Sequence, residues 1–550
     1  MALRYARSGI LSGEPRRNGY VVNDCGAEGW TPVQLTEFSS YADAQSHFSG
    51  AKLWDLFDGT REQLNLAHEC IDRHAGDPDR VAVRIVRSDG DDETLTFKTI
   101  ADASSRFANW LEAQGVGPGD RVAVMLEPSL AFYAAIFGAI KRGAVAVPMF
   151  TLFGPEGIRL RVADCTPSLL VTNAEKWEAA CELSETNVRL DTEIMSELPN
   201  FQASYSVSSK ANDLAVFQYT SGTTRALPEA VKHSHRAVVV VMNAALYATG
   251  IRPGDRFFCP SSPAWGHGLW HGTIAPLALG VETGTCAGRF SPEGLLEALE
   301  RYQITNLSAA ATHYRMMKNC GTAPQHSYYI QKLSFTGEPI DTETQTYTEK
   351  TFGVPVCSMY GTTEIGVILA NYPGAGDFLV KPGSLGKAVP GVEVEVQAPD
   401  GTPCAPDDIG EIKVRRRDAW IATRDRGWID ADGYFYHAGR ADDIIISAGW
   451  TIGAIEVEDA LLNHSDIKEA AVIGVPDELR GNIVKAFVVT SRAHSDAFID
   501  EIKEFVRNRL SAHEYPRQVV IVDELPKTPA GKVNRKVLRD REAASANSNP

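Results

Sequence analysis

The fold of this chain is decided by residues 218–235, which read Gln218-Tyr219-Thr220-Ser221-Gly222-Thr223-Thr224-Arg225-Ala226-Leu227-Pro228-Glu229-Ala230-Val231-Lys232-His233-Ser234-His235. Five small hydroxyl or glycine residues, Thr220 to Thr224, follow the apolar run Leu214 to Phe217, which predicts the end of a buried strand. Small residues let the backbone approach a ligand, and their hydroxyl and N–H groups can hold an anion such as phosphate. The stretch lacks the Gly-Lys pair of the common nucleotide loop. A Ser/Thr-rich surface loop has the same composition, so the rest of the chain must decide.

The overall composition predicts a globular protein of more than one domain. A chain of 550 residues is too long for one ordinary core. Its 44% hydrophobic and 23% charged residues are typical of such proteins. The nine cysteines are scattered and form no C-x-x-C pair. This spacing favours reduced, mostly buried thiols over a disulfide framework or a zinc site.

Charge and hydropathy limit the partners. The net charge of −16 argues against nucleic acid or an anionic membrane as the main partner, because phosphate surfaces need a basic face. No run approaches the ~20 apolar residues of a membrane span. The first twenty residues lack the apolar core of a signal peptide, although their arginines are also compatible with a transit peptide. We expect a cytoplasmic protein that binds small molecules, with a homodimer left open.

Strands and helices alternate between Val81 and Val171. Continuous apolar runs predict strands at Val81 to Val86, Val122 to Leu126 and Ala144 to Val147, and apolar spacing of three and four predicts helices at Ile100 to Leu111 and Ala131 to Lys141. Strands without polar alternation are typical of parallel sheets that are buried on both faces. We therefore expect a doubly wound α/β architecture that binds ligands beyond the carboxyl ends of its strands.

Two further changes of pattern divide the rest of the chain. A second series of strands and helices runs from Leu214 to about Val356, and short strands broken by Gly and Pro from Leu385 to Val414 predict a small β unit. Past Arg440, alternating helices and strands predict a compact α+β unit. The fold class is thus α/β, with a large N-terminal domain (residues 1–439) of doubly wound sheets plus the small β unit, and a smaller α+β C-terminal domain (residues 440–550).

Four further stretches combine residues suited to nucleotide binding and group transfer. They are Ser334-Phe335-Thr336-Gly337-Glu338-Pro339, then Met359-Tyr360-Gly361-Thr362-Thr363-Glu364, then Thr423-Arg424-Asp425-Arg426-Gly427 leading to Ala438-Gly439-Arg440-Ala441-Asp442-Asp443, and last Leu525-Pro526-Lys527-Thr528-Pro529-Ala530-Gly531-Lys532-Val533-Asn534-Arg535-Lys536. Taken singly, each is compatible with an ordinary structural role: a turn, a half-buried tyrosine, a solvated acidic turn or a basic surface loop.

Taken together, in this order and spacing, these stretches resemble the motifs of the adenylate-forming (ANL) superfamily, which includes acyl-CoA synthetases, peptide-synthetase adenylation domains and luciferases. The resemblance extends over nearly the whole chain. Within the superfamily, Ala230-Val231-Lys232-His233-Ser234-His235-Arg236 and Pro263-Ala264-Trp265-Gly266-His267 are most similar to acyl-CoA synthetases of the acetyl, medium-chain and aryl groups. The resemblance implies that the C-terminal domain is a mobile lid whose hinge lies near Asp442.

The activity that the resemblance implies is that of an AMP-forming carboxylic acid–CoA ligase, with ATP, Mg²⁺ and CoA. A carboxylate is a poor electrophile, so it needs a good leaving group. Attack of its oxygen on the α-phosphorus of ATP gives acyl-AMP and pyrophosphate, and a thiolate then converts acyl-AMP to a thioester. Such transfers depend on positioning and on cations placed where negative charge develops.

The resemblance also assigns roles to single residues. ATP would be bound by the phosphate loop Thr220, Ser221, Gly222, Thr223, Thr224 and Arg225, by Gly337, Glu338 and Pro339, by Tyr360, Gly361 and Thr362, and by Asp425 and Arg440. Thr363 would contact the α-phosphate, and Glu364 would hold Mg²⁺, a hard cation suited to oxygen ligands. The two acceptor oxygens of Asp425 suit both ribose hydroxyls. Gly449 would line the tunnel for the CoA thiol.

Lys532 is implied to be the catalytic cation of the first step, bridging the substrate carboxylate and the α-phosphate. It stands in the predicted C-terminal domain, after a glycine, whereas the nucleotide would bind to the N-terminal domain. A hinged lid could then deliver Lys532 for adenylation and withdraw it for the thiol. Its catalytic companions would be Thr363 and Glu364.

One departure from the family's pattern concerns the phosphate loop. Arg225-Ala226 stands where the family has one glycine, and Glu229 stands where it has a lysine. A carboxylate ~4 Å from a phosphate would cost about 4 kcal/mol at an effective dielectric of about 20, so Glu229 must point away. We expect Arg225 to supply the missing cation, because a guanidinium can contact two phosphate oxygens; Lys232 is the alternative.

The acid would bind in a mostly apolar pocket formed by Trp265, His267, Leu269, Ala310, Gly361 and Ile365. Gly361 stands where acetate-specific relatives carry a tryptophan, which predicts room for a medium-chain, cyclic or aromatic carboxylate. For Trp265 and Leu269, an ordinary core position is about equally compatible. His267 and His271 are four residues apart and could bind a metal from one helix face, but without a third ligand this is the weaker interpretation.

Two other functions remain open. The same first step can load an acyl group onto a carrier-protein thiol or stop at acyl-AMP. Because the phosphate loop departs from its pattern, a weakly active paralogue or a nucleotide-binding regulator without turnover is also compatible with the sequence.

Overall fold

The computed structural model describes residues 34–181, 186–219, 229–362, 364–440, 444–447, 450–477, 480–510, 515–528 and 531–547. By its contacts the stretch Leu35–Pro550 forms one unit, and the helices and strands of the described residues all belong to it. The domain boundary predicted at residues 439 and 440 falls inside that unit and stays a prediction. Of the predicted site residues, Thr220 to Arg225, Thr363, Asp442 and Gly449 lie outside the described residues.

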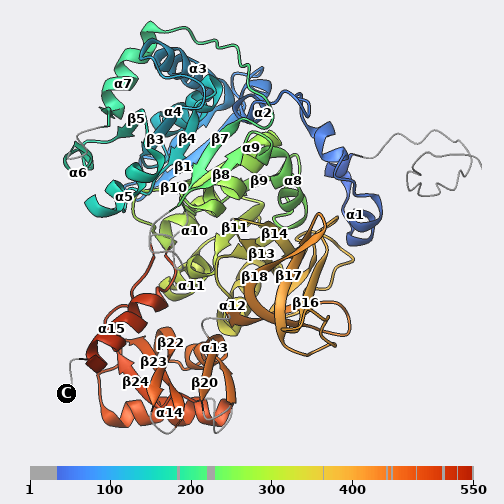
Figure 1. Ribbon diagram of the computed structural model, residues 1–550, viewed down its shortest axis with the longest axis vertical. Helices are drawn as coiled ribbons and strands as arrows, with labels where there is room; N and C mark the ends of the chain where they lie inside the picture. The colour runs from blue at the N-terminus through green and yellow to red at the C-terminus, as the bar shows by residue number, and fades with distance from the viewer. Residues whose placement is uncertain are drawn as a thin grey trace, which may run out of the picture. The chain divides into compact units, whose positions relative to one another are not determined.

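The first sheet has the strand order β6-β5-β3-β4-β7-β8 (Figure 1). Its strands are β3 (Arg121–Met125), β4 (Val145–Pro148), β5 (Leu169–Thr172), β6 (Val188–Leu190), β7 (Leu214–Gln218) and β8 (Val231–Ser234). All neighbours are parallel except β7 and β8. The predicted strands at Val122 and Ala144 are confirmed. Their apolar residues are buried, as expected for a sheet covered on both faces.

Helices α3 (Phe97–Ala113) and α4 (Leu130–Arg142), both predicted, pack against each other beside this sheet (Figure 1). Ser129 caps α4 by accepting a hydrogen bond from the Phe132 N–H, and Gly143 ends it in the left-handed region at φ 78°. The two helices cross closely, because a Cβ on Gly138 would lie only 2.8 Å from Cβ of Phe107.

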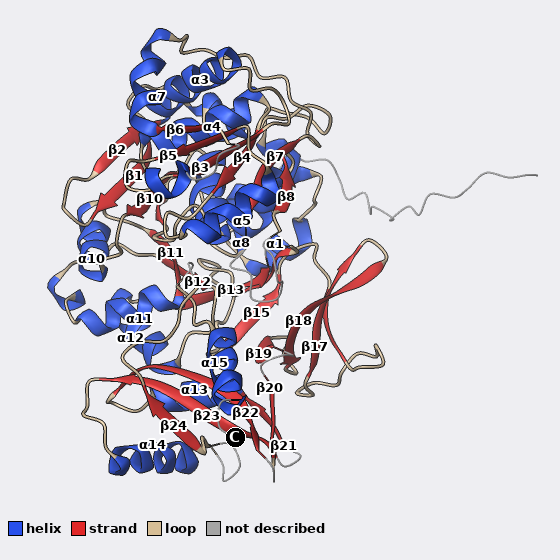
Figure 2. Ribbon diagram, turned by 60° about the vertical axis from the view of Figure 1, so that its left-hand side comes forward, coloured by secondary structure: helices blue, strands red, loops and turns tan. Residues whose placement is uncertain are grey.

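The second sheet joins the parallel series to the predicted small β unit (Figure 2). Its order is β16-β17-β18-β19-β15-β14-β13-β12-β11-β9-β10-β1-β2. The strands are β1 (Val81–Arg87), β2 (Glu93–Thr96), β9 (Arg256–Phe258), β10 (Glu282–Ala287), β11 (Asn306–Ala310), β12 (Lys332–Thr336), β13 (Val356–Thr362), β14 (Gly366–Ala370), β15 (Ser384–Ala388), β16 (Val394–Gln397), β17 (Gly410–Arg416), β18 (Ala419–Ile429) and β19 (Phe435–Arg440). From β1 to β13 most neighbours are parallel, and from β13 onward they are antiparallel. The β unit is therefore hydrogen-bonded into the α/β sheet through the β13–β14 hairpin, not separate from it.

The remaining helices of this part cover the sheets or connect their strands. They are α1 (Tyr41–His47), α2 (Leu66–Cys70), α5 (Pro155–Cys165), α6 (Trp177–Cys181), α7 (Asp191–Glu197), α8 (Ala237–Tyr247), the π-helix η5 (His267–Ile274), α9 (Ala275–Ala278), α10 (Pro292–Arg301), α11 (Ala311–Cys320) and α12 (Thr342–Phe352). Among the described residues, no helix combines the length and apolar character needed to cross a bilayer.

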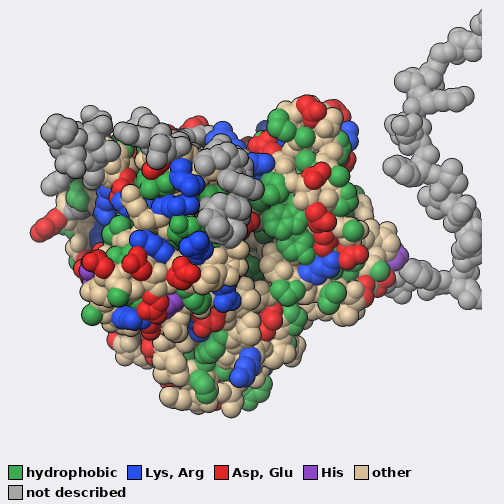
Figure 3. Space-filling view, turned by 90° about the horizontal axis from the view of Figure 1, so that it is seen from below, with side chains coloured by type: hydrophobic (Ala, Val, Ile, Leu, Met, Phe, Trp, Pro, Cys, Tyr) green, Lys and Arg blue, Asp and Glu red, His purple; other side chains and the backbone are tan. Residues whose placement is uncertain are grey.

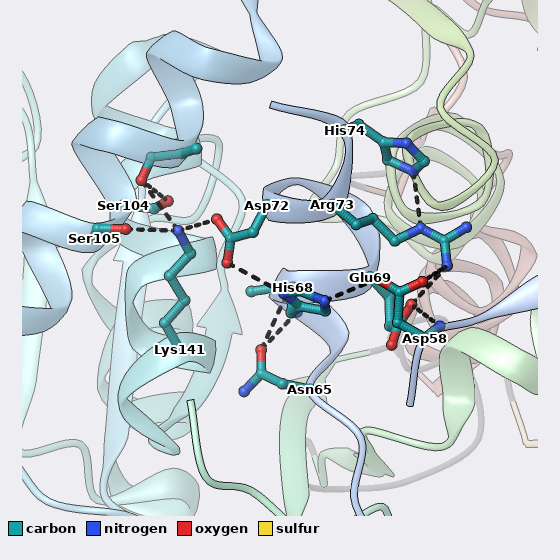
Figure 4. Close-up of polar contacts among 12 residues, drawn as sticks. Asp58, Asn65, His68, Glu69, Asp72, Arg73, His74, Ser104, Ser105 and Lys141 are labelled. Carbon is teal, nitrogen blue, oxygen red and sulfur yellow. Dashed lines mark hydrogen bonds and ion pairs between the residues drawn. The ribbon is translucent and has the colours of Figure 1, made fainter. Parts of the chain in front are cut away.

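A buried polar network fixes the short 3-10 helix η3 (Asp72–His74), which follows α2, against α3 and α4 (Figure 4). The side chain of Lys141 is 0% exposed, and its ammonium donates to Asp72 Oδ1 at 2.6 Å, to Ser105 Oγ at 2.9 Å and to the Ala101 carbonyl at 3.1 Å. Nearby, Arg73 forms an ion pair with buried Glu69 at 2.8 Å. A buried charge is tolerated only when such partners replace water, so this network is part of the fold.

The C-terminal part is the α+β unit that the sequence predicts. Strands β22 (Ile467–Asp477), β23 (Gly481–Thr490) and β24 (Gln518–Ile521) form one sheet, and β20 (Ile444–Ser447) pairs with β21 (Trp450–Gly453). Helices α13 (Ala454–Leu462) and α14 (Asp496–Arg509) share one apolar cluster with alternate residues of β22 and β23, and α15 (Arg535–Asn547) packs on the other face (Figure 2). In the view of Figure 3, acidic and basic side chains are interspersed.

Candidate active site

Three of the predicted site segments lie at the carboxyl edge of the second sheet. Ala310 ends β11, the loop 337–339 follows β12, and residues 360–362 end β13. These strands are parallel neighbours, with Ala310 paired to Thr336 and Phe335 to Ser358. Parallel strands bring their carboxyl ends to one edge, which is where ligands bind in open α/β sheets.

Gly337 is the point where three distant segments meet. Its backbone has φ +100°, which favours glycine. A Cβ placed there would lie 3.1 Å from Cη2 of Trp265 and 3.4 Å from Cε of Lys532. The loop after β12 thus accepts no larger residue, and it lies against both the predicted pocket wall and the predicted catalytic lysine.

Lys532 stands on a tight turn that directs it toward this edge. The Thr528 N–H donates to the Lys532 carbonyl at 2.7 Å, and the Gly531 N–H donates to the Thr528 carbonyl at 2.8 Å. The half-buried side chain places Nζ 5.2 Å from the ring centroid of Trp265. The structure therefore brings the predicted cation from the C-terminal part to the segments predicted to bind the acid and the nucleotide.

Tyr360 and Asp425, both predicted nucleotide contacts, are hydrogen-bonded to each other. The Tyr360 hydroxyl donates to Asp425 Oδ2 at 2.6 Å, and His437 Nε2 lies 3.8 Å from Oδ1. The Asp425 N–H donates to Thr423 Oγ1, whose hydroxyl donates to the Ile412 carbonyl. Asp425 is 8% exposed and stands opposite Arg440 in the β18–β19 pair; of Arg440 only the backbone is described.

The carboxylate of Glu338 is held by hydrogen bonds within the protein. Its Oε1 accepts hydrogen bonds from Thr312 Oγ1 at 2.6 Å and from Arg315 Nη1 at 3.3 Å. Arg315 also contacts Asp341 Oδ2 at 3.3 Å, at the start of α12. The sequence did not single out Thr312 or Arg315, which fix the loop that includes Gly337, Glu338 and Pro339.

Two further predicted residues lie at the β13–β14 hairpin, Gly361 near the end of β13 and Glu364 in the turn that follows. Glu364 is exposed, so its carboxylate oxygens are open to a hydrated cation. A Cβ on Gly361 would lie 2.0 Å from the Gly366 carbonyl oxygen and 2.7 Å from Cα of Val367. The glycine is required because the β14 backbone passes over it at a bulge in the ladder. Because the backbone alone accounts for a glycine here, Gly361 by itself gives no support to the prediction of an enlarged acid pocket.

The six residues predicted for the acid pocket are distributed over several parts of the core. Trp265 packs on the cluster of the first sheet that includes Phe217 and Ala264, Leu269 belongs to the large central cluster, and Ile365 packs on the β unit. Ala310 is 6% exposed. Of these residues, Trp265 is the one that contacts both Gly337 and Lys532. Leu269 and Ile365 are explained by ordinary core packing.

His267 forms a buried network that the sequence did not predict. Its Nδ1 lies 2.9 Å from Ser261 Oγ and its Nε2 lies 2.9 Å from Ser308 Oγ, which accepts from the Ser334 hydroxyl at 2.8 Å. Burial, with the nearby charges of His271, His313 and Lys532, lowers the pKa of His267 well below its usual value. The imidazole is therefore neutral, and both ring nitrogens are occupied by serine hydroxyls. No group of three possible metal ligands occurs among the described residues, and the His267–His271 pair gains no third one.

A second unpredicted contact joins the π-helix to β7, the strand before the predicted phosphate loop. The Trp270 indole N–H donates to Gln218 Oε1 at 2.8 Å, and Gln218 is 1% exposed. The predicted alternative cation, Lys232, is exposed and lies 5.2 Å from the Phe217 ring centroid. Glu229 is exposed, which fits the expectation that it points away from a bound phosphate.

Comparison with known proteins gives matches over most of the chain. The model of the AMP-binding enzyme family matches residues 71–421, and that of the AMP-binding enzyme C-terminal domain matches residues 456–532. The acetyl-coenzyme A synthetase of Bacillus subtilis (strain 168) is 31% identical over 544 residues, covering 91% of this chain and 94% of that protein.

Two solved structures extend the comparison. The acyl-CoA synthetase of Brucella canis is 32% identical with a TM-score of 0.71, and the match covers 92% of this chain and 99% of that chain. A benzoate CoA ligase from Burkholderia xenovorans LB400 is 25% identical with a TM-score of 0.75, and the match covers 87% of this chain and 100% of that chain. The likeness extends over the large sheets and the C-terminal part alike.

Proposed function

The chain belongs to the family of AMP-binding enzymes, and from this premise we propose that it is an AMP-forming carboxylic acid–CoA ligase for medium-chain, cyclic or aromatic acids. The observation that carries this proposal is the position of Lys532, which reaches from the C-terminal part to Gly337 and Trp265. An ammonium group beside an aromatic wall suits a substrate with a carboxylate at one end and an apolar body.

In the first step, a carboxylate oxygen of the acid attacks the α-phosphorus of ATP. The bond from that phosphorus to the oxygen that bridges to the β-phosphate breaks, and pyrophosphate leaves. We assign Lys532 to the carboxylate and the α-phosphate, where negative charge develops. Residues Thr220 to Arg225 would hold the β- and γ-phosphates, and Thr363 the α-phosphate. Mg²⁺, when bound, supplies charge neutralisation, and exposed Glu364 would hold it together with phosphate oxygens.

The nucleoside would bind between the loop 337–339 and the end of β13. Tyr360 would stack on adenine, beside Gly361 and Thr362, and Asp425 would accept the ribose hydroxyls. The hydrogen bond from Tyr360 to Asp425 supports this assignment, because it orients the ring and the carboxylate toward each other. Arg440, directly opposite Asp425 in the ladder, would add a cation near the phosphates.

In the second step, the thiolate of CoA attacks the carbonyl carbon of acyl-AMP. The bond from that carbon to the phosphate oxygen breaks and AMP leaves, while the thiol proton passes to solvent. Lys532 must withdraw to open the path, so we propose a lid that turns about Asp442 and a tunnel beside Gly449. The cytoplasmic location stays a prediction.

For the acid, we propose Trp265 and Ala310 as the apolar contacts and set the argument from Gly361 aside. The benzoate CoA ligase likeness favours an aromatic acid among the candidates. Apolar pockets discriminate by only about 1–3 kcal/mol per methylene, so we expect the enzyme to accept several acids of similar size.

The test is a panel of acids from acetate to decanoate, with benzoates and alicyclic acids, in which pyrophosphate and AMP release are both measured. We expect pyrophosphate release with ATP and acid alone, and continuous AMP release only when CoA is added. AMP release with a phosphopantetheinyl carrier protein but not with CoA would favour carrier loading. A protein that binds ATP and releases no pyrophosphate with any acid would overturn the proposal.

A further inference from the structure

The C-terminal part contacts the large part through a carboxylate at the start of a helix. Asp459 of α13 accepts a hydrogen bond from the backbone N–H of Thr342, the first residue of α12, at 3.2 Å. Another first-turn donor of α12 is satisfied by the N-cap, because the Asp341 carboxylate accepts from the Thr344 N–H at 2.8 Å. Free N–H groups and the helix dipole make this end attractive to a carboxylate.

The same short segment is contacted by Lys532 at its other end. Thr342 is five positions after Gly337, and Cε of Lys532 lies against Gly337. Between them, Arg315 links Glu338 to Asp341, with contacts of 3.3 Å to each carboxylate. Residues 337–342 are therefore held in place by the large part and contacted twice by the small one. Two contacts on one fixed segment define an orientation better than either contact alone.

Within the C-terminal part, the residue next to Asp459 ties α13 to the segment of Lys532. Glu458 is 8% exposed and accepts hydrogen bonds from both Nε and Nη2 of Arg535, at 3.0 and 2.6 Å. It also accepts from the Val472 N–H at 2.7 Å. A two-pronged guanidinium–carboxylate pair is geometrically strict, so α13 and the turn of Lys532 move together.

A cleft adjoins the start of α12, where Asp459 makes its contact. A cleft of about 310 Å³ separates Arg315, Lys318 and Glu343 of the large part from His464 and Lys468 of the small part. The pKa of Asp459 is raised, mainly by burial and also by the nearby Asp341 carboxylate, whereas its hydrogen bond to Thr342 and the charge of Arg509 act in the opposite direction.

We propose that Asp459 is a positioning residue. Its contact with α12 holds the C-terminal part in the orientation for acyl-AMP formation, and the pair of Glu458 with Arg535 fixes the segment of Lys532 in the same orientation. This inference rests on the proposed function. When Lys532 withdraws for the second step, Asp459 must move with it, because the pair of Glu458 with Arg535 joins α13 to the segment of Lys532. The hydrogen bond between Asp459 and Thr342 then breaks.

The test compares Asp459→Ala, Asp459→Asn and the control Asp500→Ala in the full-length protein. Asp500 is a carboxylate of the same part, 77% exposed and paired with Lys503. Pyrophosphate release from ATP and an accepted acid measures the first step, and thioester formation from supplied acyl-AMP and CoA measures the second. For Asp459→Ala we expect the first step to slow about 5- to 30-fold and the second to stay at the wild-type rate or rise.

Asp459→Asn keeps an acceptor oxygen and should recover most of the rate of the first step, whereas Asp500→Ala should match the wild type in both steps. Equal slowing of both steps by Asp459→Ala would show a merely structural role and overturn the inference, as would an unchanged first step. Failure of the proposed function would give a different result from failure of this inference, because the wild-type protein would then release no pyrophosphate with any acid.

Discussion

Lys141 and Lys532 lie in two regions that use a lysine in opposite ways. Lys141 is fully buried among η3, α3 and α4, and three acceptors from the surrounding helices hold its ammonium (Figure 4). Burial lowers its pKa, and the charge of Asp72 offsets part of that effect. Lys532 is half-buried on a turn, beside the face of Trp265 and a glycine.

The two lysines differ in the groups that surround their ammonium charges. The partners of Lys141 are all part of the fold, so its position is decided when the chain folds and nothing further needs to bind. Lys532 lies against an aromatic face and a backbone loop at the carboxyl edge of the second sheet, where ligands bind in open α/β sheets. A lysine whose partners are built in stabilises the structure, and a lysine at the edge of a sheet can act on a substrate.

The largest expected effect is that of Lys532→Ala on the first step. Removing the cation where charge develops should slow acyl-AMP formation about 10³- to 10⁵-fold, with thioester formation from supplied acyl-AMP and the unfolding temperature nearly unchanged. Single-turnover pyrophosphate release measures the effect. Lys527→Ala is the matched control, because Lys527 is on the same segment and forms only an exposed ion pair with Glu469. Equal loss of both half-reactions would contradict delivery by a lid.

Lys141→Ala should show the reverse pattern. It removes a fully buried side chain and leaves the half-buried carboxylate of Asp72 without that cation, and it should lower stability by about 3 kcal/mol, with little change in the rate per folded molecule. The measurement is the midpoint of thermal or urea unfolding. Lys98→Ala provides the control, because the ion pair of Lys98 with Asp102 is exposed and should contribute less than about 1 kcal/mol. An unfolding midpoint equal to that of wild type would show that the network is dispensable.

A smaller effect is expected for Tyr360→Phe, which keeps the ring and removes the hydrogen bond to Asp425. We expect the KM for ATP to rise about threefold to tenfold and the KM for the acid to stay constant. Steady-state kinetics with each substrate varied in turn separate the two constants. Tyr436→Phe removes a similar but longer bond, to Asp430 at 3.3 Å, and should change neither. If only the KM for the acid changed, Tyr360 would belong to the acid site and not to the nucleotide site.

Much of the fold could be predicted because its signals are local. The apolar run at Val122 forms β3, and the spacing from Ile100 forms α3. The α+β unit after residue 440 is also confirmed. Continuity of the second sheet could not be predicted, because hydrogen bonding between β13 and β14 depends on a hairpin whose bulge has no strong local signature.

The candidate site shows the same division. Motif order located Tyr360, Asp425 and Lys532, and the structure brings the first two into contact and the third to Gly337. The role of Gly361 in an acid pocket stays a prediction, and the tertiary structure adds a separate reason for glycine there, because a backbone passes within contact distance. The pocket roles of Leu269 and Ile365 also stay predictions; Leu269 belongs to the central core cluster and Ile365 packs against the cluster of the β unit.

The sequence by itself determined the kind of chemistry this protein can perform, because side-chain types and their order along the chain are local properties. It determined the α/β class for the same reason, since hydrophobic period depends only on neighbouring residues. Only the tertiary structure decided which residues meet: Lys532 with Trp265, Asp459 with Thr342, and the serines with His267. Most of these contacts join residues that are 41 to 267 positions apart in the sequence, and the contact of His267 with Ser261 joins residues 6 positions apart. Their free energy depends on packing in three dimensions, which no local pattern encodes.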